Sequence, residues 1–117
     1  MTNDMHDGTV AQGDAFLGDF VPRITSTAAF SNGLLLITWD EGNESATKGI
    51  DCTAQSNIDS TGCHVGVVAA SAYITPGTRD GTRYTPYSTL ASIETMDGLA
   101  LLGRAQTATP LGPGMGF

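Results

Sequence analysis

The sequence predicts an α/β fold in which a few-stranded, mostly parallel sheet is flanked by helices. Residues 33–39 (GLLLITW) form an apolar run of strand length, which is typical of a strand covered on both faces. Patterns with helical spacing lie before this run and near the C-terminus, so the expected order is helix, strand, long loop, strand, helix. This order provides too few strands for a complete sheet.

The first helix is predicted over residues 10–20. Its apolar residues recur four positions apart, as Phe16 and Phe20 do. Pro22 interrupts the pattern, and proline is best accommodated in the first turn of a helix. A second short helix is therefore expected to begin at Pro22 and to run toward Phe30.

Two polar loops surround the second predicted strand. Residues 42–63 are polar and glycine-rich without periodicity, and this is unusually long for a connection in a compact domain. Residues 64–70 (HVGVVAA) regain strand character through β-branched side chains. After the second loop, residues 78–84, a helix is expected to begin at Pro86 and to stop at Gly98.

No internal repeat divides the chain, so residues 1–117 are expected to form a single unit. Residues 106–117 are rich in proline and glycine, which predicts an irregular tail at the surface.

The two cysteines of the chain, Cys52 and Cys63, both lie in the long loop. We interpret them as a disulfide that closes a small ring and stabilises the fold by roughly 3 kcal/mol on the chain-entropy model. Free thiols are the alternative. A disulfide favours an oxidising compartment. The first residues lack the basic and then apolar pattern of a signal peptide, so any export signal is expected outside this chain.

The composition argues against several partners. Hydrophobic residues make up 40% and charged residues 15%, as in globular proteins. The net charge of −7 comes from twelve acids and five scattered bases, so no basic stripe is offered to nucleic acid or to an anionic membrane. No run reaches the roughly 20 apolar residues that a membrane-spanning helix needs.

Two clusters offer ligands for a cation. Asp40 and Glu41 follow the first predicted strand, and ligands collect at the carboxyl ends of strands in open α/β sheets. His6 and Asp7 lie near the start. Carboxylate oxygens suit Mg, Ca or Mn, and an imidazole extends the choice to Zn or Fe. The alternatives are a solvated strand end or helix cap for the acids, and a polar terminal tail for His6 and Asp7.

Other polar residues are less informative. His64 is either a hydrogen-bonded structural histidine or a ligand. Arg79 and Arg83 could clamp an anion, but arginines in a glycine-bearing loop are more often solvated. Because no G-x-S-x-G elbow is present, serine-hydrolase chemistry within this chain is unsupported.

Five segments together resemble the carboxyl-terminal portion of the phosphoesterase family that holds acid phosphatases and phospholipases C, in the alkaline-phosphatase-like superfamily. In order they are NDMHDGTVAQGDAFL, FVPRI, LLLITWDEG, HVGVVAASAYITPGT and YTPYSTLASIETMDGLALLGRA, which together cover most of residues 3–105. The resemblance implies a partial alkaline-phosphatase-like sandwich and a secreted or periplasmic enzyme. It also implies hydrolysis of phosphate esters that depends on a divalent metal ion (Mg, Ca, Mn, Zn or Fe).

The resemblance also implies roles for individual residues. Asp40 and Glu41 match the metal-binding acidic pair of the family. His6 and Asp7 match its catalytic HD element beside the phosphate, and we expect His6 and the acidic pair to converge on one cation that binds the phosphoryl group. His64 matches a histidine before the following strand and is expected to contact substrate.

The chain departs from the family pattern in three places. Pro86 stands where members often carry the histidine of Y-x-H-Y-S, and Ser71-Ala72 replaces a frequent Ser-Pro. The E-N-x-S motif, which carries further ligands and the nucleophile, has no counterpart. Because Met1 lies just before the HD element, we expect a truncated or excised fragment, weak in catalysis, that self-associates or pairs with a missing amino-terminal half.

Two other functions remain open at this point. One is a non-catalytic secreted module that binds a cation or a partner through its acidic strand end. The other is a serine esterase or lipase.

Overall fold

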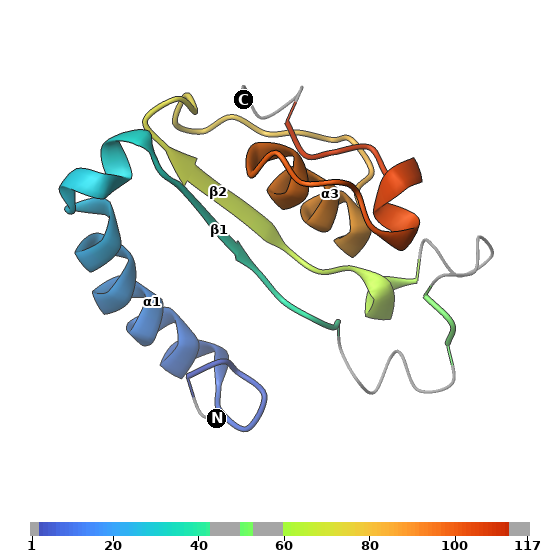
Figure 1. Cartoon of the computed structure of the whole chain (residues 1–117). Helices are drawn as coiled ribbons and strands as arrows, with labels where there is room; N and C mark the ends of the chain where they lie inside the picture. Colours follow the sequence, from blue (N-terminus) through green and yellow to red (C-terminus); the bar gives the residue numbers. More distant parts are fainter. Residues whose placement is uncertain (1–2, 43–49, 53–59, 113–117) are drawn as a thin grey trace. The chain divides into compact units, whose positions relative to one another are not determined.

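The computed structural model describes residues 3–42, 50–52 and 60–112 (Figure 1). The chain divides into two compact units, Met1–Leu34 and Leu35–Phe117, which are described separately. Within the described ranges, no helix combines the length and the apolar character needed to cross a membrane.

The first unit contains one long helix, α1 (Val10–Thr25). A capping box fixes its start, because the Gln12 backbone N–H donates to Thr9 Oγ1 (3.2 Å) and the Thr9 N–H donates to Gln12 Oε1 (2.7 Å). Two backbone donors that a helix end leaves without partners are thereby satisfied. Phe16 and Phe20 stack on one side of the helix with ring centroids 5.2 Å apart.

The prediction of a helix break at Pro22 is wrong. The helix continues through Pro22 to Thr25, and the Pro22 carbonyl still accepts from the Ser26 N–H (3.0 Å). Proline removes one donor, and here only the last turn follows it, so little of the helix depends on the lost bond. A short 3₁₀ helix, η1 (Ala28–Asn32), follows as a separate element.

The described residues form a two-stranded sheet of β1 (Leu34–Thr38) and β2 (Val67–Ser71) (Figure 1). The strands run in opposite directions. The Thr38 hydroxyl reaches across to the carbonyl oxygen of Gly66 at 2.9 Å and fastens the carboxyl end of β1 to the start of β2.

The fold is α/β as predicted, but the prediction of a mostly parallel sheet is wrong. That prediction interpreted the apolar run as a strand buried on both faces. In the structure, four residues of β1 are only half-buried and the fifth, Thr38, is exposed. A parallel pair also needs a crossover, usually a helix. The described part of the connection contains only a short 3₁₀ turn, η3 (Thr61–Cys63), and the chain turns back beside itself.

The predicted disulfide is confirmed. Cys52 and Cys63 are bonded, with their Cα atoms 5.4 Å apart and 11 positions apart in the sequence. The bond ties η3 to the long connection between the strands. Most of the predicted loop 42–63 lies outside the described residues.

The last helix, α3 (Pro86–Met96), starts and stops where the sequence predicts. Pro86 occupies its first turn, and the Thr85 N–H donates to Ser88 Oγ (3.1 Å). At the other end Gly98 adopts a positive φ of 67°, and the Leu99 N–H donates to the Glu94 carbonyl (2.7 Å). This Schellman arrangement ends the helix at a residue that accepts the left-handed conformation.

The buried side of α3 consists of alanine, serine and glutamate side chains. Ala91 is fully buried, and with it Ser92 and Glu94, each 3% exposed. Another 3₁₀ helix, η4 (Gly103–Thr107), packs against this helix (Figure 1). The Ser92 hydroxyl accepts a hydrogen bond from the buried Leu111 N–H (2.7 Å) and donates one to the Ser88 carbonyl. The bond from Leu111 links the chain after η4 to α3.

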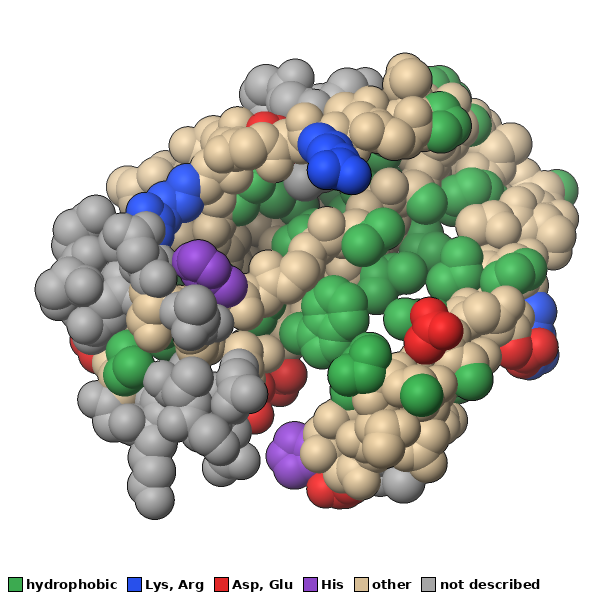
Figure 2. All heavy atoms as spheres, turned by 180° about the vertical axis from the view of Figure 1, so that it is seen from behind, with side chains coloured by type: hydrophobic (Ala, Val, Ile, Leu, Met, Phe, Trp, Pro, Cys, Tyr) green, Lys and Arg blue, Asp and Glu red, His purple; other side chains and the backbone are tan. Residues whose placement is uncertain are grey.

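Large hydrophobic side chains are instead exposed on the other side of α3. Leu90, Ile93 and Met96 are 37%, 44% and 53% exposed. Figure 2 likewise shows hydrophobic side chains open to view on the face that it displays. The predicted tail, residues 106–117, includes the end of η4 and the buried Leu111, and residues 113–117 lie outside the described part.

Candidate functional site

The acidic pair lies where β1 ends. Asp40 and Glu41 follow Trp39 directly, and both are exposed. The backbone of the next residue, Gly42, comes against the start of the returning chain. A Cβ atom at Gly42 would overlap the carbonyl oxygen of Gly62 and would lie 3.1 Å from that of His64. Only glycine fits this close approach.

Antiparallel pairing therefore brings His64 to the same end of the sheet as the acids. His64 precedes β2 and is exposed. The Trp39 ring packs over Gly66, the residue before β2, because a Cβ atom at Gly66 would lie 2.9 Å from Trp39 Cζ3. In a parallel sheet the residue before β2 would stand at the opposite end from the residues after β1. The sequence predicts Asp40, Glu41 and His64 as candidate site residues. Only the observed antiparallel direction of the strands places all three at the same end of the sheet.

The two carboxylates suit a hard divalent cation only in part. Among the described residues, no group of three or more His, Cys, Asp or Glu side chains is placed to hold a metal ion. Mg²⁺ in enzymes often uses one or two protein carboxylates and completes its shell with water and substrate phosphate. The donor set of Asp40 and Glu41 fits such a cation and does not form a complete protein cage.

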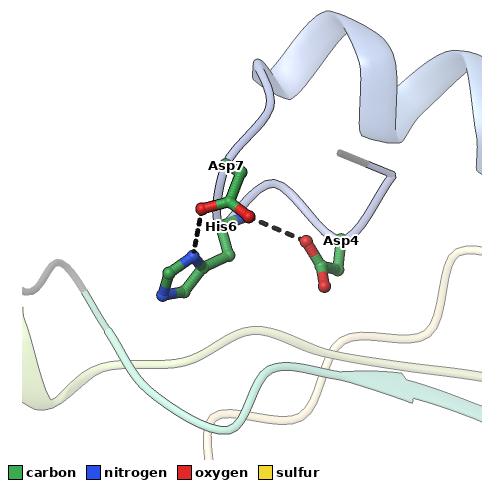
Figure 3. A network of polar contacts seen from close by, with 3 residues as sticks. All are labelled: Asp4, His6 and Asp7. Atoms are coloured by element: carbon green, nitrogen blue, oxygen red, sulfur yellow. Dashed lines mark hydrogen bonds and ion pairs between the residues drawn. The ribbon is translucent and has the colours of Figure 1, made fainter. Parts of the chain in front are cut away.

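His6 and Asp7 form a hydrogen-bonded pair in the first unit (Figure 3). His6 Nδ1 lies 2.8 Å from Asp7 Oδ1, and the two side chains are 61% and 58% exposed. Because a carboxylate only accepts, the imidazole proton in this pair belongs on Nδ1, and the basic lone pair is then on Nε2. This is the arrangement in which a carboxylate orients a histidine for proton transfer.

The segment that carries this pair is shaped by its neighbours. The His6 backbone N–H donates to Asp4 Oδ1 (3.1 Å), as Figure 3 shows. Met5 has a positive φ of 70°, and its side chain covers the buried Gly13, where a Cβ would come within 2.9 Å of the Met5 sulfur. The sequence places Asp4 in the same N-terminal cluster as His6 and Asp7, and an aspartate two residues before a bonded N–H is a recognisable turn pattern.

The His6–Asp7 pair and the group of Asp40, Glu41 and His64 lie in different units. Their convergence on one cation, which the sequence predicted, therefore stays a prediction.

Pro86, which stands where the resemblance implies a histidine, lies at the start of a helix. Pro86 opens α3, and a hydrogen-bonded turn precedes it. The Tyr84 hydroxyl donates to Asp80 Oδ2 (2.7 Å), and the Thr82 N–H donates to Asp80 Oδ1 (2.8 Å). The hydrogen bond from Tyr84 is the main cause of the lowered pKa of Asp80, and the same hydrogen bond raises the pKa of Tyr84.

Comparison with known proteins identifies the family of this chain. The model of the phosphoesterase family matches residues 1–100. A phosphatidylinositol-3-phosphatase of Mycobacterium tuberculosis is 34% identical over 109 residues, which cover 93% of this chain and 31% of that protein. The chain thus spans about a third of the length of this relative. None of the solved structures gives a significant match. On the strength of the family match and of this relative, the chain belongs to the phosphoesterase family.

Proposed function

We propose that this chain is part of a metal-dependent phosphoesterase that hydrolyses phosphate monoesters. The observation that carries the proposal is that Asp40, Glu41 and His64 lie at the same end of the antiparallel sheet, where the backbone at Gly42 approaches that of His64, within a chain of the phosphoesterase family. The name of the mycobacterial relative supports a phosphomonoester as substrate, with a phosphorylated inositol headgroup as the first one to test.

Each residue has a distinct task in this proposal. Asp40 and Glu41 hold the divalent cation through their exposed carboxylates. A bound divalent cation neutralises phosphate charge and polarises the phosphoryl oxygen. His64, beside Gly42 in the fold, contacts a phosphate oxygen. His6 acts in its protonated form: it gives the proton on Nε2 to the leaving oxygen and returns to the neutral ring, while Asp7 holds the ring through Nδ1. No residue of this chain is assigned as the nucleophile.

The disulfide supports a secreted or periplasmic location. Structural disulfides persist in oxidising compartments and are rare in the cytosol.

The test combines turnover and metal binding. Hydrolysis of p-nitrophenyl phosphate is measured after chelation and after addition of Mg, Ca, Mn or Zn, with bis(p-nitrophenyl) phosphate as the diester comparison. We expect metal-dependent cleavage of the monoester that Asp40→Asn abolishes. Asp19→Asn is the matched control, because Asp19 is an exposed aspartate of α1. Turnover that survives both chelation and Asp40→Asn would overturn the metal-dependent proposal.

A second candidate is a non-catalytic module that binds a cation. It is favoured by the incomplete ligand set within the described residues. Calorimetric titration separates the two: metal binding that Asp40→Asn removes, without any turnover, supports the module. If neither metal binding nor turnover is found, both candidates fail.

A further inference from the structure

A shallow hollow at the start of α3 brings two arginines together. Its volume is about 290 Å³. Arg83 and Arg104 line it with the Tyr87 ring, and hydroxyl groups border it at Thr85, Ser88 and Thr107. These residues come from the loop before α3, from the first turn of the helix and from η4. The hollow belongs wholly to the second unit, and its residues differ from those of the proposed catalytic site.

The charge of this hollow is opposite to that of the chain. The protein carries twelve acids and five bases. Two of those five bases line the hollow, and none of its lining residues is acidic. An anion is repelled by the net charge of the protein and finds here a local positive field, so the hollow selects for negative ligands.

Arg104 is held in a position that suits an oxyanion. Its guanidinium carbon lies 5.7 Å from the centre of the Tyr87 ring, within the range of a cation–π contact. η4, which carries Arg104, packs against α3 (Figure 1), and its Ala105 is fully buried. Within the described residues, Arg104 forms no ion pair with a carboxylate. A guanidinium that no carboxylate neutralises can offer its N–H groups to the paired bonds that phosphate oxygens accept.

The start of α3 adds to this field. Thr85 precedes the helix, and Tyr87 and Ser88 belong to its first turn. Backbone amides at a helix start carry partial positive charge, which favours an anion placed there. This contribution reinforces the two arginines and would not by itself define a site.

We propose that this hollow binds a phosphate group, either as inorganic phosphate or as part of a small phosphorylated headgroup. Its volume lies at the small end of the range for ligand pockets, which suits a compact anion better than an extended ligand. Arg104 and Arg83 supply the charge, and the Tyr87 ring orients Arg104. Binding here does not require the cation of the catalytic site.

The test measures phosphate binding by the full chain in the presence of EDTA, so that a failure of the proposed catalytic function does not affect the result. Inorganic phosphate, glycerol 3-phosphate and vesicles with a phosphorylated inositol lipid are titrated separately at constant ionic strength. The variants are Arg104→Gln, Arg83→Gln and Arg104→Lys. Arg23→Gln is the matched control, because Arg23 is exposed on α1 and pairs with Asp19 at 3.6 Å.

We expect Arg104→Gln and Arg83→Gln each to weaken binding about five- to tenfold, and Arg23→Gln to leave it unchanged. Arg104→Lys should retain part of the affinity, because lysine keeps the charge and loses the planar fork. The three arginines that are changed are exposed, and circular dichroism verifies that the variants fold. Binding of inorganic phosphate would identify the free ion as a sufficient ligand, and binding of glycerol phosphate or vesicles alone would identify the headgroup. Equal affinity in all variants, or no binding of any of the three probes, would overturn the proposal.

Discussion

Replacing Gly42 by alanine tests the geometry of the acidic strand end without removing any polar group. The new methyl carbon would overlap the carbonyl oxygen of Gly62 and would press on that of His64. Both neighbours are backbone atoms that cannot turn aside as a flexible side chain can. Gly62 is moreover buried, next to the disulfide-bonded Cys63. The two segments must therefore move apart.

Overpacking of this kind typically costs about 1–3 kcal/mol. For a chain of this length, 1 kcal/mol corresponds to a shift of about 4 °C in Tm, so Gly42→Ala should lower Tm by about 4–12 °C. Gly81→Ala is the control in the same unit, because a Cβ at Gly81 meets no atom within 4 Å. It should be neutral or raise the stability by less than about 1 kcal/mol.

Thermal melting followed by circular dichroism gives the first readout, and the NMR signals of His64 give the second. We expect Gly42→Ala to lower Tm and to shift the His64 signals. Gly81→Ala should leave the His64 signals in place and should raise the stability by less than about 1 kcal/mol, if at all. If Gly42→Ala has the same Tm as the unsubstituted chain and leaves the His64 signals in place, the close approach between the end of β1 and the segment before β2 is refuted. The shared position of the acids and His64 would then lose its support.

Three further predictions follow from other contacts. Ser92→Ala leaves the buried Leu111 N–H without its acceptor and should destabilise the fold by about 1–3 kcal/mol, with faster hydrogen exchange of that amide; unchanged exchange would contradict this. Tyr84→Phe should raise the pKa of Asp80 toward its ordinary 3.8, as NMR titration would show. In the unsubstituted chain, the contribution of Asp80 to stability is present above pH 3.8 and is lost as the pH falls through the lower folded pKa. The contribution of Tyr84 is present below pH 10.0 and is lost as the pH rises through its raised folded pKa. The chain should self-associate through the exposed apolar side of α3, and Ile93→Gln should reduce the mass measured by light scattering; a monodisperse monomer would contradict this.

Local signals in the sequence predicted several elements well. The proline at the start and the glycine at the end of α3 act within one turn of the chain, so their effect can be read without the fold. The disulfide was predictable for the same reason, since both cysteines lie close together in one polar loop. The acidic pair could be placed at a strand end because the apolar run stops abruptly at Trp39.

The direction of the strands could not be predicted from these signals. An apolar run indicates a strand and does not state which neighbour it pairs with or on which faces it is covered. Pro22 shows a related limit, because the effect of a proline depends on how much of the helix follows it. The hollow beside α3 was missed because Arg104 and Tyr87 are 17 positions apart and meet only through the packing of η4.

The packing of α3 reverses the usual relation between polarity and tolerance to substitution. Serine and glutamate side chains of this helix are enclosed and bonded, as Glu94 is to the Leu102 N–H (3.2 Å), whereas its leucine, isoleucine and methionine side chains reach solvent. A scan of all substitutions along the helix would therefore find that polar replacements are accepted at the apolar positions. It would also find that even small changes are rejected at Ser92 and Glu94. A hydropathy profile alone would rank these positions in the opposite order.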